Sequence, residues 1–222
     1  DSAGRATGSS LATATTDSDG RFTLTGFTPP SGASVLLAQS SGGSYVDESD
    51  PESNPSLKRK VSLTSVQGFE GIVVVGQTTV AITPYSDAFL TKARRAAAGA
   101  NVVGFFSAVR NQAVAAFGFD PFTTLPEPPL SPSPSAPTAA LAYAMMLVGA
   151  DNAINDISLK LGTVPTYATV RAFIDDFSDG RLDGLRDGSA VQVSGKNIAN
   201  DVRLNDEIRR FRNNNFGAYG SA

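Results

Sequence analysis

The chain contains neither cysteine nor histidine among its 222 residues. Without cysteine it can form no disulfide, no thiolate metal site and no cysteine nucleophile. Without histidine it lacks the commonest general base, the Ser-His-Asp triad and histidine-ligated zinc. These absences exclude most hydrolytic and metal-redox chemistry. We therefore expect a protein that is not an enzyme and that uses no organic cofactor.

Charge and long apolar runs are also scarce. Charged residues make up 18% of the chain, and the formal net charge is −3. This weak acidic balance gives no reason to expect nucleic acid or an anionic membrane as a partner. The longest apolar run near a predicted helix, residues 139–148, is too short to span a bilayer. The rest of the composition is rich in Ser, Thr, Ala and Gly, which is typical of extracellular β-rich modules.

Residues 13–27 carry the clearest local pattern in the sequence. Phe22 and Leu24 alternate with polar residues at the period of a half-buried strand. The segment from Asp17 to Gly20 has turn chemistry, because Asp can bond its own backbone and Gly accepts a positive φ. The pattern predicts a β-hairpin. Asp17 and Asp19 are in addition a weak candidate pair for calcium.

Further short segments before residue 83 are predicted to be strands, because they alternate or are apolar and are bounded by turn residues. These segments, together with the two arms of the hairpin, are residues 11–16, 21–25, 34–39, 59–66, 72–75 and 78–82. Closely spaced short strands of this kind predict an antiparallel β-sandwich over residues 1–82.

The spacing Thr16-Asp17-x-x-Gly20-x-Phe22-x-Leu24 resembles the turn of carboxypeptidase-regulatory-like and Cna-B-like domains, which are transthyretin-like β-sandwiches. The resemblance implies a binding or scaffolding module of a secreted or surface-attached bacterial protein. In that family one or two strands normally precede the segment aligned with residues 11–16, whereas ten polar residues precede it here. An open sheet edge is therefore expected, with self-association by strand addition into an extracellular filament.

From Thr83 onward the pattern changes to helical spacing. Thr83 and Pro84 form a good helix start, and Asn101 can cap a second helix that ends before Gly118. The helices are predicted over residues 84–98, 102–117, 139–148, 152–161, 166–177 and 202–211. Residues 119–137 contain seven prolines and are predicted to be an extended linker. The expected fold class is thus α+β, with an N-terminal antiparallel β-sandwich followed by a C-terminal α-helical domain over residues 83–222.

The order of these features resembles a class of bacterial surface proteins and lipoproteins. A sandwich is followed by the helix start at Thr83, then by the segment from Phe117 to Phe122, and later by the sequence SDGRLDG. The resemblance implies a location outside the cell or on the bacterial cell surface, with a structural or adhesion role. The basic residues of the first helix, Lys92, Arg94 and Arg95, are interpreted as a solvated face.

Acidic residues gather near the end of the predicted helix 166–177, where glycines follow them. The candidates for a calcium site are Asp175, Asp176, Asp179 and Asp183. Calcium takes about six to eight oxygens from carboxylates and carbonyls held in a turn. The match to an EF-hand loop is poor, because Phe177 would occupy the third position and Arg186 the twelfth. The alternative is that the aspartates only make turns.

These observations favour a non-catalytic structural subunit that is secreted or attached to the cell surface. The alternative is a carbohydrate- or protein-binding module of a larger extracellular protein, with a glycan or a surface protein as its partner. A third interpretation, a hydrolase that uses two carboxylates, stays open because Asp and Glu pairs are frequent.

Overall fold

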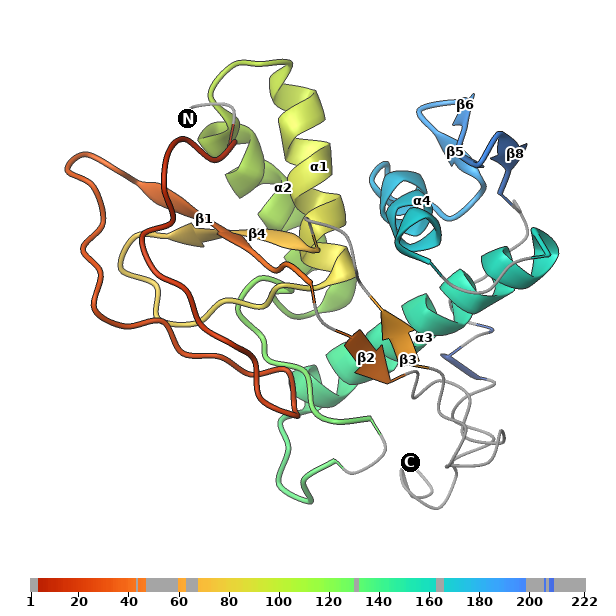
Figure 1. The fold of residues 1–222 in the computed structure, drawn as a ribbon, viewed down its shortest axis with the longest axis horizontal. Coiled ribbons are helices and arrows are strands. Elements are labelled where there is room, and N and C mark those ends of the chain that lie inside the picture. The colour runs from red at the N-terminus through yellow and green to blue at the C-terminus, as the bar shows by residue number, and fades with distance from the viewer. Residues whose placement is uncertain are drawn as a thin grey trace.

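The computed structural model describes residues 4–42, 44–46, 60–62, 68–129, 132–162, 166–198, 206 and 208–209. The regular structure among these residues consists of four long helices and four small antiparallel sheets of two strands each (Figure 1). None of the helices in this part of the chain is long and apolar enough to cross a membrane. The predicted helix at 202–211 lies largely outside the described residues.

Four helices lie in the part of the chain where helical spacing was predicted, and the first two begin at the predicted caps Thr83 and Asn101. They are α1 (Pro84–Ala97), α2 (Val102–Phe117), α3 (Thr138–Lys160) and α4 (Tyr167–Phe177). At the start of α1 the Thr83 side chain accepts a hydrogen bond from the N–H of Ser86, and the Ser86 hydroxyl accepts one from the N–H of Thr83. This capping box satisfies two backbone donors that a helix start otherwise leaves unpaired. Asn101 caps α2 in the predicted way, with Oδ1 2.9 Å from the N–H of Val103.

The two helices predicted at 139–148 and 152–161 form one continuous helix, α3. A glycine inside a helix costs about 1 kcal/mol relative to alanine, so Gly149 favours a break when only the local sequence is considered. Gly149 and Ala150 are both buried in the structure. Packing of the buried helix therefore outweighs the local preference of this glycine.

The strands are short. β1 (Val35–Gln39) pairs antiparallel with β4 (Glu70–Val74), so that Leu37 lies opposite Ile72. β2 (Ser44–Val46) pairs with β3 (Lys60–Ser62). After α4, two hairpins are formed by β5 (Leu185–Arg186) with β6 (Ser189–Ala190) and by β7 (Gln192–Val193) with β8 (Lys196–Asn197).

The predicted β-sandwich over residues 1–82 is wrong. The described strands before residue 83 form two separate sheets of two strands, and residues 11–16, 21–25 and 78–82 are not strands. The fold is helical with small sheets, so the predicted likeness to carboxypeptidase-regulatory-like and Cna-B-like domains, which are β-sandwiches, is wrong. The open sandwich edge does not exist either. The extracellular filament expected from that edge therefore loses its basis, and so does the adhesion role expected from the resemblance to surface proteins that begin with a sandwich.

The turn at the centre of the predicted hairpin is present. Asp17 Oδ1 accepts hydrogen bonds from the N–H groups of Asp19 and Arg21, both at 2.9 Å. The alternation also persists, because Phe22 and Leu24 are half-buried while Arg21 is exposed. The local pattern thus identifies the turn and the two faces. A strand ladder requires in addition a paired partner strand, which a local pattern cannot supply.

One hydrophobic core joins the sheet formed by β1 and β4 to the helices. Ile72 and Ala81 belong to the same buried cluster as Tyr85 and Leu90 of α1. The core therefore continues across the predicted domain boundary between residues 82 and 83. The division into residues 1–82 and 83–222 remains a prediction.

Aromatic rings fill the centre of this core. The ring of Tyr85 makes edge contacts with Phe117, Phe173 and Phe177, at centroid distances of 5.9, 6.0 and 5.1 Å. The Tyr85 hydroxyl donates to the carbonyl of Met146 at 2.8 Å. These contacts tie α1 to α2, α3 and α4 at a single residue, and they satisfy its one polar group.

The first part of the predicted linker 119–137 belongs to the core. Phe119 and Phe122 are buried, and the Phe122 ring lies 4.7 Å from that of Phe106 on α2. Asp120 between them accepts hydrogen bonds from Arg110 Nε at 2.9 Å and from the N–H of Phe122 at 3.0 Å. The segment therefore begins as a tight turn that covers the end of α2.

Candidate functional site

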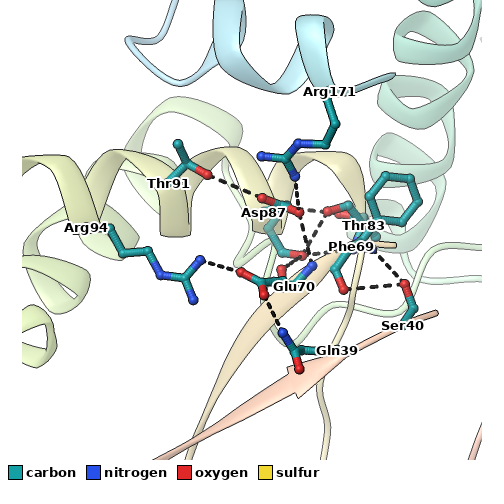
Figure 2. Close-up of polar contacts among 10 residues, drawn as sticks. Gln39, Ser40, Phe69, Glu70, Thr83, Asp87, Thr91, Arg94 and Arg171 are labelled. Carbon is teal, nitrogen blue, oxygen red and sulfur yellow. Dashed lines mark hydrogen bonds and ion pairs between the residues drawn. The ribbon is translucent and has the colours of Figure 1, made fainter. Parts of the chain in front are cut away.

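Asp87 is the most deeply buried carboxylate of the candidate site. It lies in the first turn of α1 and is 1% exposed. Its Oδ2 accepts a hydrogen bond from the Arg171 guanidinium of α4 at 2.8 Å and one from the N–H of Glu70 at 3.1 Å. Thr91, one turn further along α1, donates to Oδ1 at 3.3 Å. Figure 2 shows that these donors approach Asp87 from three different elements.

Glu70, the first residue of β4, extends this network. Its side chain forms an ion pair with Arg94 of α1 and accepts a hydrogen bond from Gln39 of β1 (Figure 2). Arg94 donates in addition to the backbone carbonyl of Gly4. The buried carboxylate network, defined here as Asp87, Glu70, Arg94 and Arg171, thus joins the N-terminal residues, β1, β4, α1 and α4.

The charges of the network balance, with two carboxylates facing two guanidinium groups. Burial raises the pKa of Asp87 above its ordinary value of 3.8, and the nearby Arg171 opposes this increase. A general acid or base must reach a substrate proton within hydrogen-bond distance. Asp87 is instead enclosed by donors of its own chain. The arrangement is suited to holding α1 against α4 and β4.

None of these four residues was predicted as a site residue, and Arg94 was interpreted as solvated. Arg94 contacts Glu70, and the neighbouring Arg95 pairs with Asp187 and donates to the Ser178 hydroxyl at 2.6 Å. One signal was available in the sequence. Asp87 precedes Leu90 by three residues, so it lies on the apolar side of α1. An acid on that side needs a buried partner, but the partner cannot be named from local sequence.

Two of the four predicted calcium ligands hold the turns after α4. Asp176 is buried, and its carboxylate accepts hydrogen bonds from the N–H of Asp183 at 3.2 Å and from that of Gly184 at 3.1 Å. Asp179 accepts from the N–H of Arg181 at 3.0 Å and from that of Asp187 at 3.1 Å. These bonds link the end of α4 to the hairpin of β5 and β6.

The other two predicted ligands have separate partners. Asp183 Oδ1 accepts from the N–H of Leu185 at 3.0 Å, and Asp175 pairs with Arg186 at 3.4 Å. In the described part of the chain, no group of three or more acidic side chains is placed to hold a metal ion. The hydrogen bonds favour the turn interpretation of the four aspartates, and calcium stays a prediction.

A chelator separates the two interpretations. Because N–H donors already occupy these carboxylates, we expect EDTA to leave the melting temperature unchanged, measured by circular dichroism with and without millimolar calcium. A calcium ion bound only to the native state would instead raise the melting temperature by mass action. A rise with calcium that EDTA reverses and that Asp179→Ala removes would establish the calcium site.

Asp176 should make stability depend on pH. Burial raises its pKa from 3.8 to about 6, the N–H bonds from Gly184 and Asp183 oppose the increase, and the nearby Asp183 and Asp179 add to it. The native state therefore takes up this proton near pH 6, whereas the unfolded chain does so only near 3.8. The stabilisation from protonation is complete below pH 3.8 and is lost as the pH rises through about 6.

We therefore expect the free energy of unfolding to rise by about 1 kcal/mol when the pH is lowered from 7 to 5, relative to the same change in the Asp176→Asn variant. Urea unfolding of both proteins at each pH measures the difference. The burial of Asp87 acts in the same direction in both proteins, so its contribution cancels. A difference between the two proteins that stays constant across this pH range would contradict the role given to Asp176.

No known family model matches the chain, and no curated protein or solved structure is similar enough to count as a match. The likenesses expected from the short motifs at Asp17–Leu24 and in the later SDGRLDG segment therefore gain no support from whole-chain comparison. The function has to be inferred from the chemistry of the residues themselves.

Proposed function

We propose that the chain is a non-catalytic structural module, in which the buried carboxylate network joins non-helical segments to a helical core. A single observation carries this proposal. The carboxylates of Asp87, Asp120 and Asp176, which face the interior, accept hydrogen bonds from arginines or backbone N–H groups of the same chain. The lack of histidine and cysteine also favours a non-catalytic role. A location outside the cell or on the cell surface stays a prediction from composition.

The surface of α2 favours a second candidate, a protein-binding module. Its only charged residue, Arg110, is paired with Asp120. The exposed positions of α2 are all uncharged, whereas solvated helix faces ordinarily carry charged side chains. These exposed residues are Gly104, Phe105, Ser107, Ala108, Asn111, Gln112, Val114, Ala115 and Ala116.

A protein partner that binds this face of α2 should no longer bind the Val114→Arg variant. It should still bind the Arg181→Ala variant, which changes an exposed residue after α4. The glycan alternative has no comparable observation in its favour.

The absence of catalysis can be tested directly. We expect the purified protein to show no turnover of ester, peptide or glycoside substrates above the rate in buffer. The result that would overturn the proposal is a bell-shaped pH–rate profile set by two carboxylates. Such a rate should also disappear in Asp176→Asn or Asp87→Asn, while circular dichroism shows that the helices are retained.

A further inference from the structure

The outer face of α2 is exposed to solvent along the whole helix. α2 packs against α1 (Figure 1) with the buried residues that recur along one of its sides. Outside that side, Phe105 and Val114 are 40% and 37% exposed. Two exposed apolar residues are common on a protein surface and do not by themselves indicate a partner. Three further features of this face do.

The first feature is Gly104, which lies on the centre line of the face. Glycine stabilises a helix less than alanine does. Gly104 has no positive φ, and among the described atoms outside the nearby backbone of α2 none lies within 4 Å of a Cβ atom added there. The single chain therefore has room for alanine at this position. An exposed helix glycine instead allows a second backbone to come close.

The second feature is the absence of charge on the face. The only charged residue of α2, Arg110, is paired with Asp120 of the same chain. A two-fold axis brings each group of one copy close to the same group of the other copy, where like charges would repel. A neutral face avoids this repulsion. A foreign partner, in contrast, ordinarily gains specificity and association rate from complementary charges, and α2 presents none.

The third feature is the chemistry of the polar side chains. Asn111 and Gln112 are exposed amides, and an amide carries both donors and an acceptor. Each can therefore form a hydrogen bond with an identical side chain, which neither a carboxylate nor an ammonium group can do. The remaining polar side chain, Ser107, donates to the carbonyl of Val103 in its own helix at 3.2 Å. The face is thus complementary to itself.

An antiparallel arrangement of two α2 helices matches the residues in size. A two-fold axis that crosses the helix midway between Gly104 and Ala115 places these two residues level with each other in opposite copies. The same axis places Ala108 level with Asn111. Small side chains then meet along the centre line, so the helices can approach closely. The two Asn111 amides lie near the axis, within reach of each other.

We propose that the chain forms a two-fold symmetric dimer in which α2 packs antiparallel against α2 of a second copy. Phe105 and Val114 flank this contact and lose exposed area in it. The proposal rests on the second candidate function, the protein-binding face of α2, and identifies its partner. The face offers nine exposed residues, fewer than the roughly 20–30 that a standard interface uses on each side. We therefore expect a weak dimer, with a Kd of about 100 μM.

Sedimentation equilibrium of the whole chain between about 10 μM and about 1 mM measures the dimer. We expect dimer at the upper end of this range, its loss in Val114→Arg, and the parental behaviour in Arg181→Ala. A monomer at every concentration, or a dimer that Val114→Arg leaves intact, would overturn the proposal. Binding of a foreign protein that Val114→Arg abolishes, with the free chain monomeric throughout, would overturn the dimer and keep the protein-binding function.

Gly104→Ala separates a dimer contact from an ordinary helix surface. At about 10 μM, where the chain is monomeric, the variant should melt at the parental temperature or above it, because alanine favours the helix and has room there. Its Kd for dimerisation should nevertheless rise by about tenfold or more, because the added methyl groups hold the two helices apart. An unchanged Kd would overturn the close approach at Gly104.

A charge exchange at Asn111 tests whether the partner is a second copy. Asn111→Asp and Asn111→Lys should each be monomeric across the concentration range, because each places like charges together near the axis. Circular dichroism checks that both variants keep the helices. An equimolar mixture should restore association, since opposite charges then meet in the mixed dimer. A mixture that stays monomeric, or single variants that dimerise as the parent does, would overturn the two-fold contact of α2 with itself.

Discussion

Replacing Asp87 with alanine is expected to lower the free energy of unfolding by about 2–3 kcal/mol. The change leaves the Arg171 guanidinium without the carboxylate it faces and removes the acceptor of the Glu70 N–H. Asp87 is 1% exposed, so the Glu70 N–H loses its acceptor where little water can reach it, whereas the Arg171 side chain is 31% exposed and can be rehydrated. Urea unfolding at pH 7, followed by circular dichroism at a helix band, measures the effect.

Asp156→Ala is the matched control for this substitution. Asp156 also lies on a helix and faces a cation, Lys160 at 3.6 Å, but its side chain is 29% exposed. A pair of this kind contributes at most about 1 kcal/mol. Equal losses in the two variants would show that the network around Asp87 has no special role in holding the fold.

The Phe122→Ala variant is expected to lose about 3–5 kcal/mol of stability. The Phe122 ring is fully buried, and it meets Phe106 at 4.7 Å and Phe89 at 6.2 Å in ring-centroid distance. Removing it leaves a cavity between the two helices of the hairpin. Thermal and urea unfolding compared with the parent chain provide the measurement.

Leu125→Ala tests the same segment three residues later, where the side chain is 49% exposed. A surface substitution of this kind usually changes stability by less than about 0.5 kcal/mol. If residues 119–137 were a spacer throughout, both variants would be nearly neutral. A neutral Phe122→Ala would therefore contradict the placement of this ring in the core.

Helices were the part of the fold that the sequence predicted best, because their signals are local. The bounds predicted for α2 agree with the structure, since Asn101, the apolar spacing and Gly118 all lie within one short stretch. The break predicted within α3 failed at Gly149, where burial outweighs propensity. Local signals are reliable where caps and periodicity agree, and less so where packing decides.

Strands were predicted near β1 and β4, but their pairing and the candidate site could not be predicted, because both depend on contacts between distant residues. An alternating segment such as residues 21–25 shows which side chains are half-buried, but not whether a second strand is available to pair with it. β1 pairs with β4 across an intervening stretch that contains β2 and β3. Likewise Asp87 meets Arg171, which lies 84 residues further along the chain.

A double-mutant cycle between Asp87 and Arg171 tests the central claim most directly. The cycle compares the unfolding free energies of the parent chain, Asp87→Asn, Arg171→Met and the double variant. If the buried carboxylate network holds α1 against α4, the two changes should be coupled by about 1–3 kcal/mol, because the second change removes the charge that the first leaves unpaired. Effects that add to within about 0.3 kcal/mol would contradict the claim.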